Sequence, residues 1–101
     1  MSKVAIALSV YEPNPEFLKQ LLISIDEQSF NGPITIYARI DGGKDPLCAK
    51  KWLKEHTFLS SNITLKIEIG ENLGAKKSFL TIISTLESFD FIFFADQDDI
   101  W

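Results

Sequence analysis

The stretch that decides the fold is VAIALSV, residues Val4 to Val10, which is apolar at nearly every position instead of alternating. A strand has this pattern when helices cover both of its faces, as in a parallel sheet. The stretch is also far shorter than the roughly 20 residues that a helix needs to span a bilayer. We therefore predict a buried strand of a parallel sheet.

Strand-like and helix-like stretches alternate along the rest of the chain. Further strands are predicted at Ile34 to Ile40, Ile63 to Ile69 and Phe91 to Ala95, and helices over residues 17–25, from Asp45 onward, and from about Ala75 to Glu87. The stretch Ile63 to Ile69 alternates more clearly than the others, which indicates a strand near the edge of the sheet. The order β-α-β-α-β-α-β predicts an α/β fold, a Rossmann-like open parallel sheet with helices on both faces.

The composition is that of one globular domain. Among 101 residues, 46% are hydrophobic and 24% are charged, which excludes disordered and low-complexity classes. Ten Lys and Arg against fourteen Asp and Glu give a net charge of -4, so we expect no nucleic-acid partner. The single cysteine, Cys48, cannot form an intramolecular disulfide, and this predicts a reducing, cytoplasmic location.

Polar side chains follow the predicted strands, at the edge of the sheet where parallel α/β folds bind ligands. Ser9 and Tyr11 come at the end of the first strand, and Asp41 follows the second. Asp96 and Asp98 follow the fourth. Because like charges at one edge repel each other unless a cation or solvent relieves them, this arrangement favours a metal site.

The segment Asp96-Gln97-Asp98-Asp99 is the sharpest of these signals. Two carboxylates separated by one residue can face a single Mg²⁺ or Mn²⁺ ion, although a solvated acidic turn is an equally ordinary reading. Asp41-Gly42-Gly43 is weaker, because Asp before Gly occurs in many turns. Lys76-Lys77 is more typical of a solvated helix face than of a phosphate clamp, and the isolated His56 is expected at the surface. No glycine-rich dinucleotide or P-loop motif is present.

Taken together, these residues resemble the amino-terminal half of a family 2 glycosyltransferase of GT-A fold. The matching segments are Ser9 and Tyr11 with the helix Leu18 to Gln28, Asp41-Gly42 after the second strand, Asn72-Leu73-Gly74 before the third helix, and Asp96 to Trp101 as the metal motif. The run Lys76-Lys77-Ser78-Phe79 is closest to rhamnosyltransferase-like members.

The resemblance implies that residues 1–101 form a single nucleotide-sugar-binding unit, the N-terminal part of a longer glycosyltransferase domain. It implies that Ser9, Tyr11 and Asp41 bind the nucleotide base. It implies that Asp96 and Asp98 bind the ribose and a Mn²⁺ or Mg²⁺ ion that holds the diphosphate. The donor would be a UDP- or dTDP-sugar and the acceptor a sugar or lipid-linked glycan. No acidic residue matches the family's general base, so no catalytic residue is assigned.

The function implied is that of an inverting, metal-dependent glycosyltransferase in surface polysaccharide synthesis, cytoplasmic or, at full length, at the inner membrane face. A stand-alone nucleotide-binding module without transferase activity is the alternative. A nucleotidyltransferase is a third reading, but it would carry a Gly- and Arg-rich loop where this chain has Tyr11-Glu12-Pro13-Asn14. We also expect self-association through Phe91 to Ala95, because an unpaired apolar strand edge tends to pair with another chain.

Overall fold

The computed structural model describes residues 3–28, 30, 32–86 and 89–97, and it confirms the predicted α/β fold. Within that part of the chain, the strands are β1 (Val4–Val10), β2 (Ile34–Asp41), β3 (Ile63–Gly70) and β4 (Phe91–Asp96), and the helices are α1 (Pro15–Asp26), α2 (Pro46–Glu55) and α3 (Ala75–Thr85). The strands form one parallel sheet in the order β3-β2-β1-β4.

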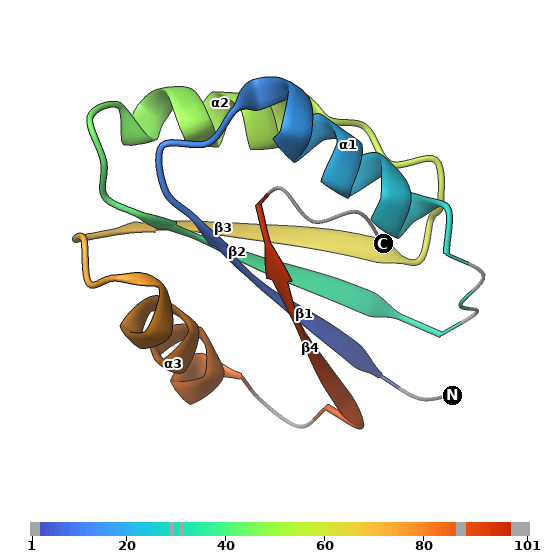
Figure 1. Cartoon of the computed structure of the whole chain (residues 1–101). Helices are drawn as coiled ribbons and strands as arrows, with labels where there is room; N and C mark the ends of the chain where they lie inside the picture. The colour runs from blue at the N-terminus through green and yellow to red at the C-terminus, as the bar shows by residue number, and fades with distance from the viewer. Residues whose placement is uncertain (1–2, 29, 31, 87–88, 98–101) are drawn as a thin grey trace.

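The helices form two layers, with α1 and α2 on one face of the sheet and α3 on the other (Figure 1). The chain moves outward from β1 to β2 and β3, and then α3 carries it back across the sheet to β4, on the far side of β1. Because such crossovers are right-handed, reversing their direction moves the helix to the opposite face. This is why α3 lies on the opposite face of the sheet from α1 and α2. The direction in which successive strands are added reverses between β1 and β4.

The hydrophobic core lies between the sheet and the layer of α1 and α2. β1 is buried along nearly its whole length, as its continuous apolar pattern predicts. The start of α1 is defined by Asn14, whose Oδ1 accepts hydrogen bonds from the N–H groups of Glu16 (2.9 Å) and Phe17 (3.2 Å), with Pro15 in the first helical position. Of the helices in the described ranges, none is long and apolar enough to cross a membrane.

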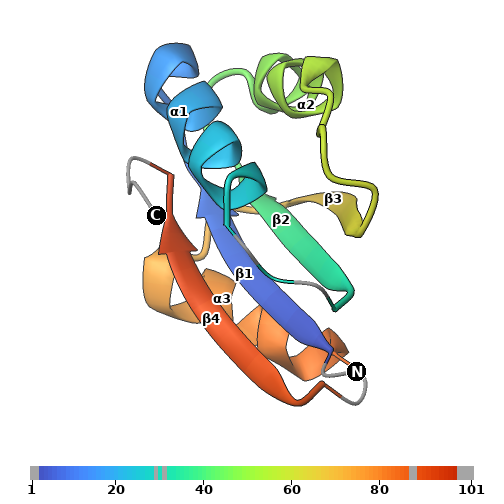
Figure 2. The same ribbon diagram turned by 90° about the vertical axis from the view of Figure 1, so that its right-hand side faces the viewer.

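The two edge strands differ in how well their patterns indicate burial. β3 alternates between exposed and partly buried positions over most of its length, which confirms its predicted place at an edge. β4 lies along the opposite edge (Figure 2), and only Ala95 in it is buried. Phe91 is 53% exposed and Phe94 is 54% exposed. The apolar run Phe91 to Ala95 thus correctly predicted a strand, but an apolar run at this position does not mean that the side chains of the strand are buried.

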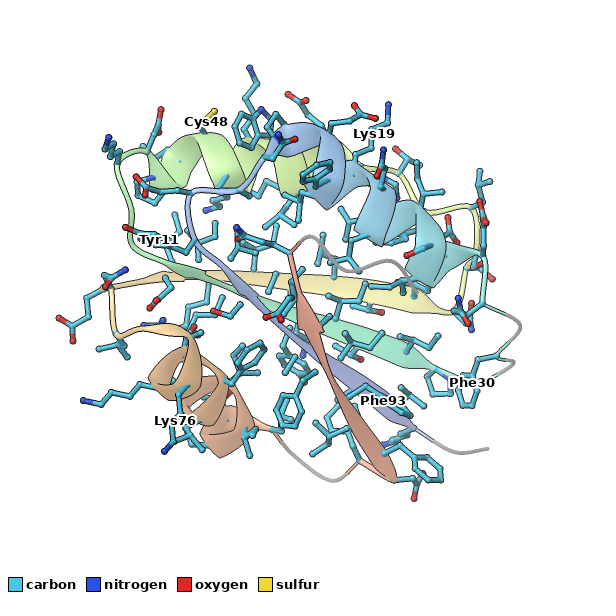
Figure 3. All side chains as sticks on the ribbon, in the orientation of Figure 1. Tyr11, Lys19, Phe30, Cys48, Lys76 and Phe93 are labelled. Atoms are coloured by element: carbon cyan, nitrogen blue, oxygen red, sulfur yellow. The ribbon has the colours of Figure 1, made fainter. Side chains whose placement is uncertain are left out.

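We expect the chain to self-associate at high concentration through β4. Phe93, labelled in Figure 3, is 46% exposed and borders an almost wholly apolar cavity of about 400 Å³ between β1, β4 and the end of α1. Lysine on an edge strand opposes pairing with another chain, so Phe93→Lys should shift the protein toward monomer. Size-exclusion chromatography with light scattering measures this. A parent chain that stays monomeric at high concentration would contradict the expectation.

Candidate functional site

A cavity of about 480 Å³ opens where the carboxyl ends of β1, β2 and β4 face the start of α3. It lies beside the point where the strand order reverses, which is where open α/β sheets bind their ligands. Its lining is made of Ser9, Tyr11, Asp41, Asn72, Gly74, Ala75, Asp96 and Gln97. The structure therefore brings together the predicted binding residues that it describes.

A second cavity, of about 570 Å³, lies between α1 and α2. None of the four described strands contributes to its lining, which includes Trp52 and His56. His56 is partly buried there, and its Nε2 has no hydrogen-bond partner within the described ranges, so a plain surface location was the wrong expectation. We assign the candidate site to the smaller cavity because polar groups from three strands converge on it.

Asp41 is the most tightly held residue of the site. It is the last residue of β2, it is 1% exposed, and its carboxylate accepts three hydrogen bonds. Oδ1 accepts from Nη1 of Arg39 (2.6 Å) and from the N–H of Leu73 (2.8 Å), and Oδ2 accepts from the N–H of Gly74 (3.0 Å). A carboxylate offers about four acceptor positions, so the bonds from the described residues leave one position of Asp41 unused, and Asp41 is among the residues that line the cavity.

The charge state of Asp41 follows from the same contacts. Burial alone would raise the pKa of its carboxyl. The N–H of Leu73, the guanidinium of Arg39 and the N–H of Gly74 outweigh this effect and hold the pKa below its ordinary value. Asp41 is therefore a carboxylate at neutral pH, a group that can only accept hydrogen bonds.

Arg39 holds this arrangement together, and sequence analysis missed it. Its guanidinium, buried beside Asp41, also donates to Oγ of Ser78 (3.0 Å) and to the carbonyl of Glu71 (3.0 Å). Gly70 on the neighbouring strand leaves room for it, because an added Cβ there would overlap the guanidinium. The signal in the sequence was a charged residue inside the apolar run ITIYARI, two positions before Asp41 and so on the same face of the strand.

Ser9 joins the same network from β1. Its hydroxyl donates to Oγ of Ser78 on α3 (2.8 Å), which leaves the Ser9 oxygen able to accept from the cavity side. Together with the carboxylates of Asp41 and Asp96, it makes a cavity wall rich in acceptors. Such a wall suits a ligand that presents N–H and O–H donors.

Tyr11 lies just after β1 (Figure 3), 46% exposed in the lining of the cavity. A hydrogen bond with Glu12 and the charge of that residue raise the pKa of the Tyr11 phenol, so the phenol is protonated at neutral pH. The backbone N–H and C=O of Tyr11 are hydrogen-bonded to the side-chain amide of Gln97, which follows β4. Gln97, like Arg39, is a residue of the site that sequence analysis did not assign.

The predicted metal site remains a prediction. Asp96 is exposed at the end of β4 and lines the cavity, whereas Asp98 and Asp99 lie outside the described residues. Among the residues that are described, no group of three His, Cys, Asp or Glu could hold a metal ion. The Asp96 carboxylate fits Mg²⁺ or Mn²⁺ in chemical type, since these ions bind one or two carboxylates together with substrate oxygens.

Lys76 does not face the cavity. It is exposed on α3 and points away from the sheet (Figure 3), and Lys77 is exposed as well. This agrees with a solvated helix face and not with a phosphate clamp.

Two solved structures share this arrangement of strands and helices over 97% of the chain. They are TarS from S. aureus (TM-score 0.70, 22% identity, 17% of that chain covered) and TarS 1-349 from S. aureus (TM-score 0.71, 22% identity, 28% of that chain covered). This chain has the fold of TarS. TarS is a family 2 glycosyltransferase, and the chain spans less than a third of either TarS structure. No family model and no curated protein matches the sequence.

Proposed function

We propose that this chain is the nucleotide-sugar-binding portion of an inverting, metal-dependent glycosyltransferase that takes part in surface polysaccharide synthesis. The observation that carries the proposal is the convergence of Ser9, Tyr11, Asp41 and Asp96 on one cavity at the ligand-binding edge of a sheet that has the TarS fold. The donor is a UDP- or dTDP-sugar. The acceptor is a sugar or a lipid-linked glycan, and the reaction takes place on the cytoplasmic side.

The base of the nucleotide binds against the acceptor-rich wall. Uracil and thymine each carry one ring N–H between two carbonyl oxygens, and the remaining acceptor position of Asp41 can take that proton in a hydrogen bond. The exposed ring of Tyr11 offers a surface on which the base can stack. The resemblance of the run Lys76 to Phe79 to rhamnosyltransferase-like members does not choose between the two bases.

The diphosphate needs a positive charge that the described cavity wall does not supply. Asp41 and Asp96 line the cavity and the whole chain carries a net charge of -4, so direct contact with an anion is repulsive. Asp98 would hold the Mn²⁺ or Mg²⁺ ion, with Asp96 on the ribose. The bound ion would neutralise the diphosphate and assist its departure as a leaving group.

Nucleotide binding should therefore stabilise the protein only when the metal is present. At a nucleotide concentration about one hundred times the dissociation constant, the fold gains roughly 2.7 kcal/mol. In a domain of this length that raises the melting midpoint by about 10 to 20 °C. The measurement is a thermal melt with UDP or dTDP, in the presence of Mn²⁺ or of a chelator, for the parent chain and for Asp98→Asn.

Glu68→Gln is the matched control, because it removes one negative charge from an exposed position on β3, at the opposite edge of the sheet. It should respond to nucleotide and Mn²⁺ like the parent. An equal shift with chelator, or a parent-like response of Asp98→Asn, would show that the metal assignment is wrong. Because no residue of this chain is assigned as the general base, transfer from UDP- or dTDP-sugars is expected only from a longer protein that contains this unit, and transfer by such a protein would support the transferase over the stand-alone nucleotide-binding module.

A further inference from the structure

The hydrogen bonds between β1 and β4 continue beyond the end of the strand ladder. The last paired residues of the two strands are Ser9 and Asp96. Beyond them the side-chain amide of Gln97 replaces the backbone of β4 as the hydrogen-bonding partner of the chain after β1. Its Oε1 accepts from the N–H of Tyr11 (2.6 Å) and its Nε2 donates to the carbonyl of Tyr11 (2.8 Å). The side chain of Gln97 is thus hydrogen-bonded to both the N–H and the C=O of Tyr11.

The loop that Gln97 holds is one that needs support. Glu12, next to Tyr11, has a φ of +41°, a region that side-chain-bearing residues rarely adopt. The ring of Tyr11 lies close to Gly43, since a Cβ added to Gly43 would be 3.8 Å from Tyr11 Cε1. A strained loop keeps such a conformation only when surrounding contacts determine it, and the two bonds to Gln97 are contacts of this kind.

We infer that Gln97 is a positioning residue that joins the two walls of the nucleotide cavity, fixing the Tyr11 loop on one side to Asp96 on the other. The inference rests on the proposed function. Gln97 is next to Asp96 in the chain, and its two hydrogen bonds hold the backbone of Tyr11. Gln97 therefore sets the distance between Asp96, which we place on the ribose, and Tyr11, which we place on the base. A ligand that touches both walls gains affinity from a cavity whose walls are already at the right separation.

The chemistry of a primary amide explains why glutamine stands at this position. An amide presents one acceptor oxygen and one donor nitrogen side by side, which match the C=O and N–H of a peptide. A carboxylate of the same shape presents two acceptors, so one of its oxygens would face the Tyr11 carbonyl without a proton between them.

The test uses Gln97→Glu, Gln97→Met and the parent chain, with Gln20→Glu as the control. Gln20→Glu adds the same negative charge on the exposed side of α1. Affinity for UDP and dTDP with Mn²⁺ is measured by calorimetry at pH 7.5. Hydrogen exchange at the Tyr11 amide is measured by NMR in the nucleotide-free protein, and thermal melts confirm that each variant is folded.

At pH 7.5 we expect Gln97→Glu and Gln97→Met to bind nucleotide about tenfold more weakly than the parent, the effect of losing one or two net hydrogen bonds. Gln20→Glu should match the parent. Tyr11 amide exchange should be faster in Gln97→Met than in the parent.

Two results separate this inference from the proposed function. If the parent binds no nucleotide but Gln97→Met still accelerates exchange at Tyr11, the contact stands and the proposed function fails, and with it the positioning role. If the parent binds nucleotide and the Gln97 variants bind it equally well, the positioning role is overturned while the proposed function stands.

Discussion

Replacing Arg39 with methionine is expected to lower the free energy of unfolding by about 3 to 5 kcal/mol, the range for a buried ion pair that loses one partner. Arg39 is 4% exposed and Asp41 is 1% exposed, so the carboxylate left behind would be a buried charge without its counter-charge. Ser78 and the carbonyl of Glu71 would lose a donor in the same step. Urea denaturation at pH 7 measures the effect.

The same substitution should change how stability depends on pH. In the parent, the pKa of Asp41 lies below its ordinary value of 3.8, so Asp41 contributes stability above about pH 3.8 that is lost as the pH falls through its lowered pKa. In Arg39→Met the carboxyl keeps only the N–H groups of Leu73 and Gly74, and its pKa should rise. Acid unfolding should then begin at a higher pH than in the parent.

Lys51→Met is the matched control, because it removes a cation from an ion pair at the surface. Nζ of Lys51 lies 3.8 Å from Oε1 of Glu55, and the two side chains are 72% and 59% exposed. Such pairs contribute about 0 to 1 kcal/mol, so the control should unfold nearly like the parent. If Arg39→Met is no more destabilising than Lys51→Met, Arg39 does not hold the site together.

Changing Gly70 to alanine is expected to destabilise the protein by about 3 kcal/mol, the upper end of the usual cost of overpacking. The added Cβ would occupy the space of the Arg39 guanidinium. Moving the guanidinium away is costly because its hydrogen bonds to Asp41, Ser78 and Glu71 are lost together. Urea denaturation again measures the change.

A double-mutant cycle shows whether this cost acts through Arg39. In the Arg39→Met background the flexible, uncharged side chain can make room, so Gly70→Ala should cost much less there than in the parent. The interaction energy of the two substitutions should lie in the range of about 0.5 to 3 kcal/mol that contacting residues show. Strictly additive effects would mean that Gly70 is needed for some reason other than the guanidinium.

The order of elements and the edge that carries the site could be predicted from the sequence. Continuous apolar runs and helical spacing are local patterns, and each strand boundary was predicted to within one residue. The differences are that β2 ends at Asp41 instead of Ile40, β3 at Gly70 instead of Ile69, and β4 at Asp96 instead of Ala95. Because parallel strands end at a common edge, the alternation of strands and helices was enough to predict that Ser9, Asp41 and Asp96 lie near one another.

Only the tertiary structure decided how those residues are held and how much of β4 is buried. The bond from Ser9 to Ser78 joins positions 69 apart in the chain, and the bonds from Gln97 to Tyr11 join positions 86 apart, so no local pattern indicates them. The apolar side chains of β4 are exposed because β4 lies at an edge and, in the described part of the chain, packs mainly against β1, whereas β3 at the other edge also packs against α2. A residue's own sequence neighbours determine the type of element it enters, whereas its partners and its burial depend on how distant elements pack.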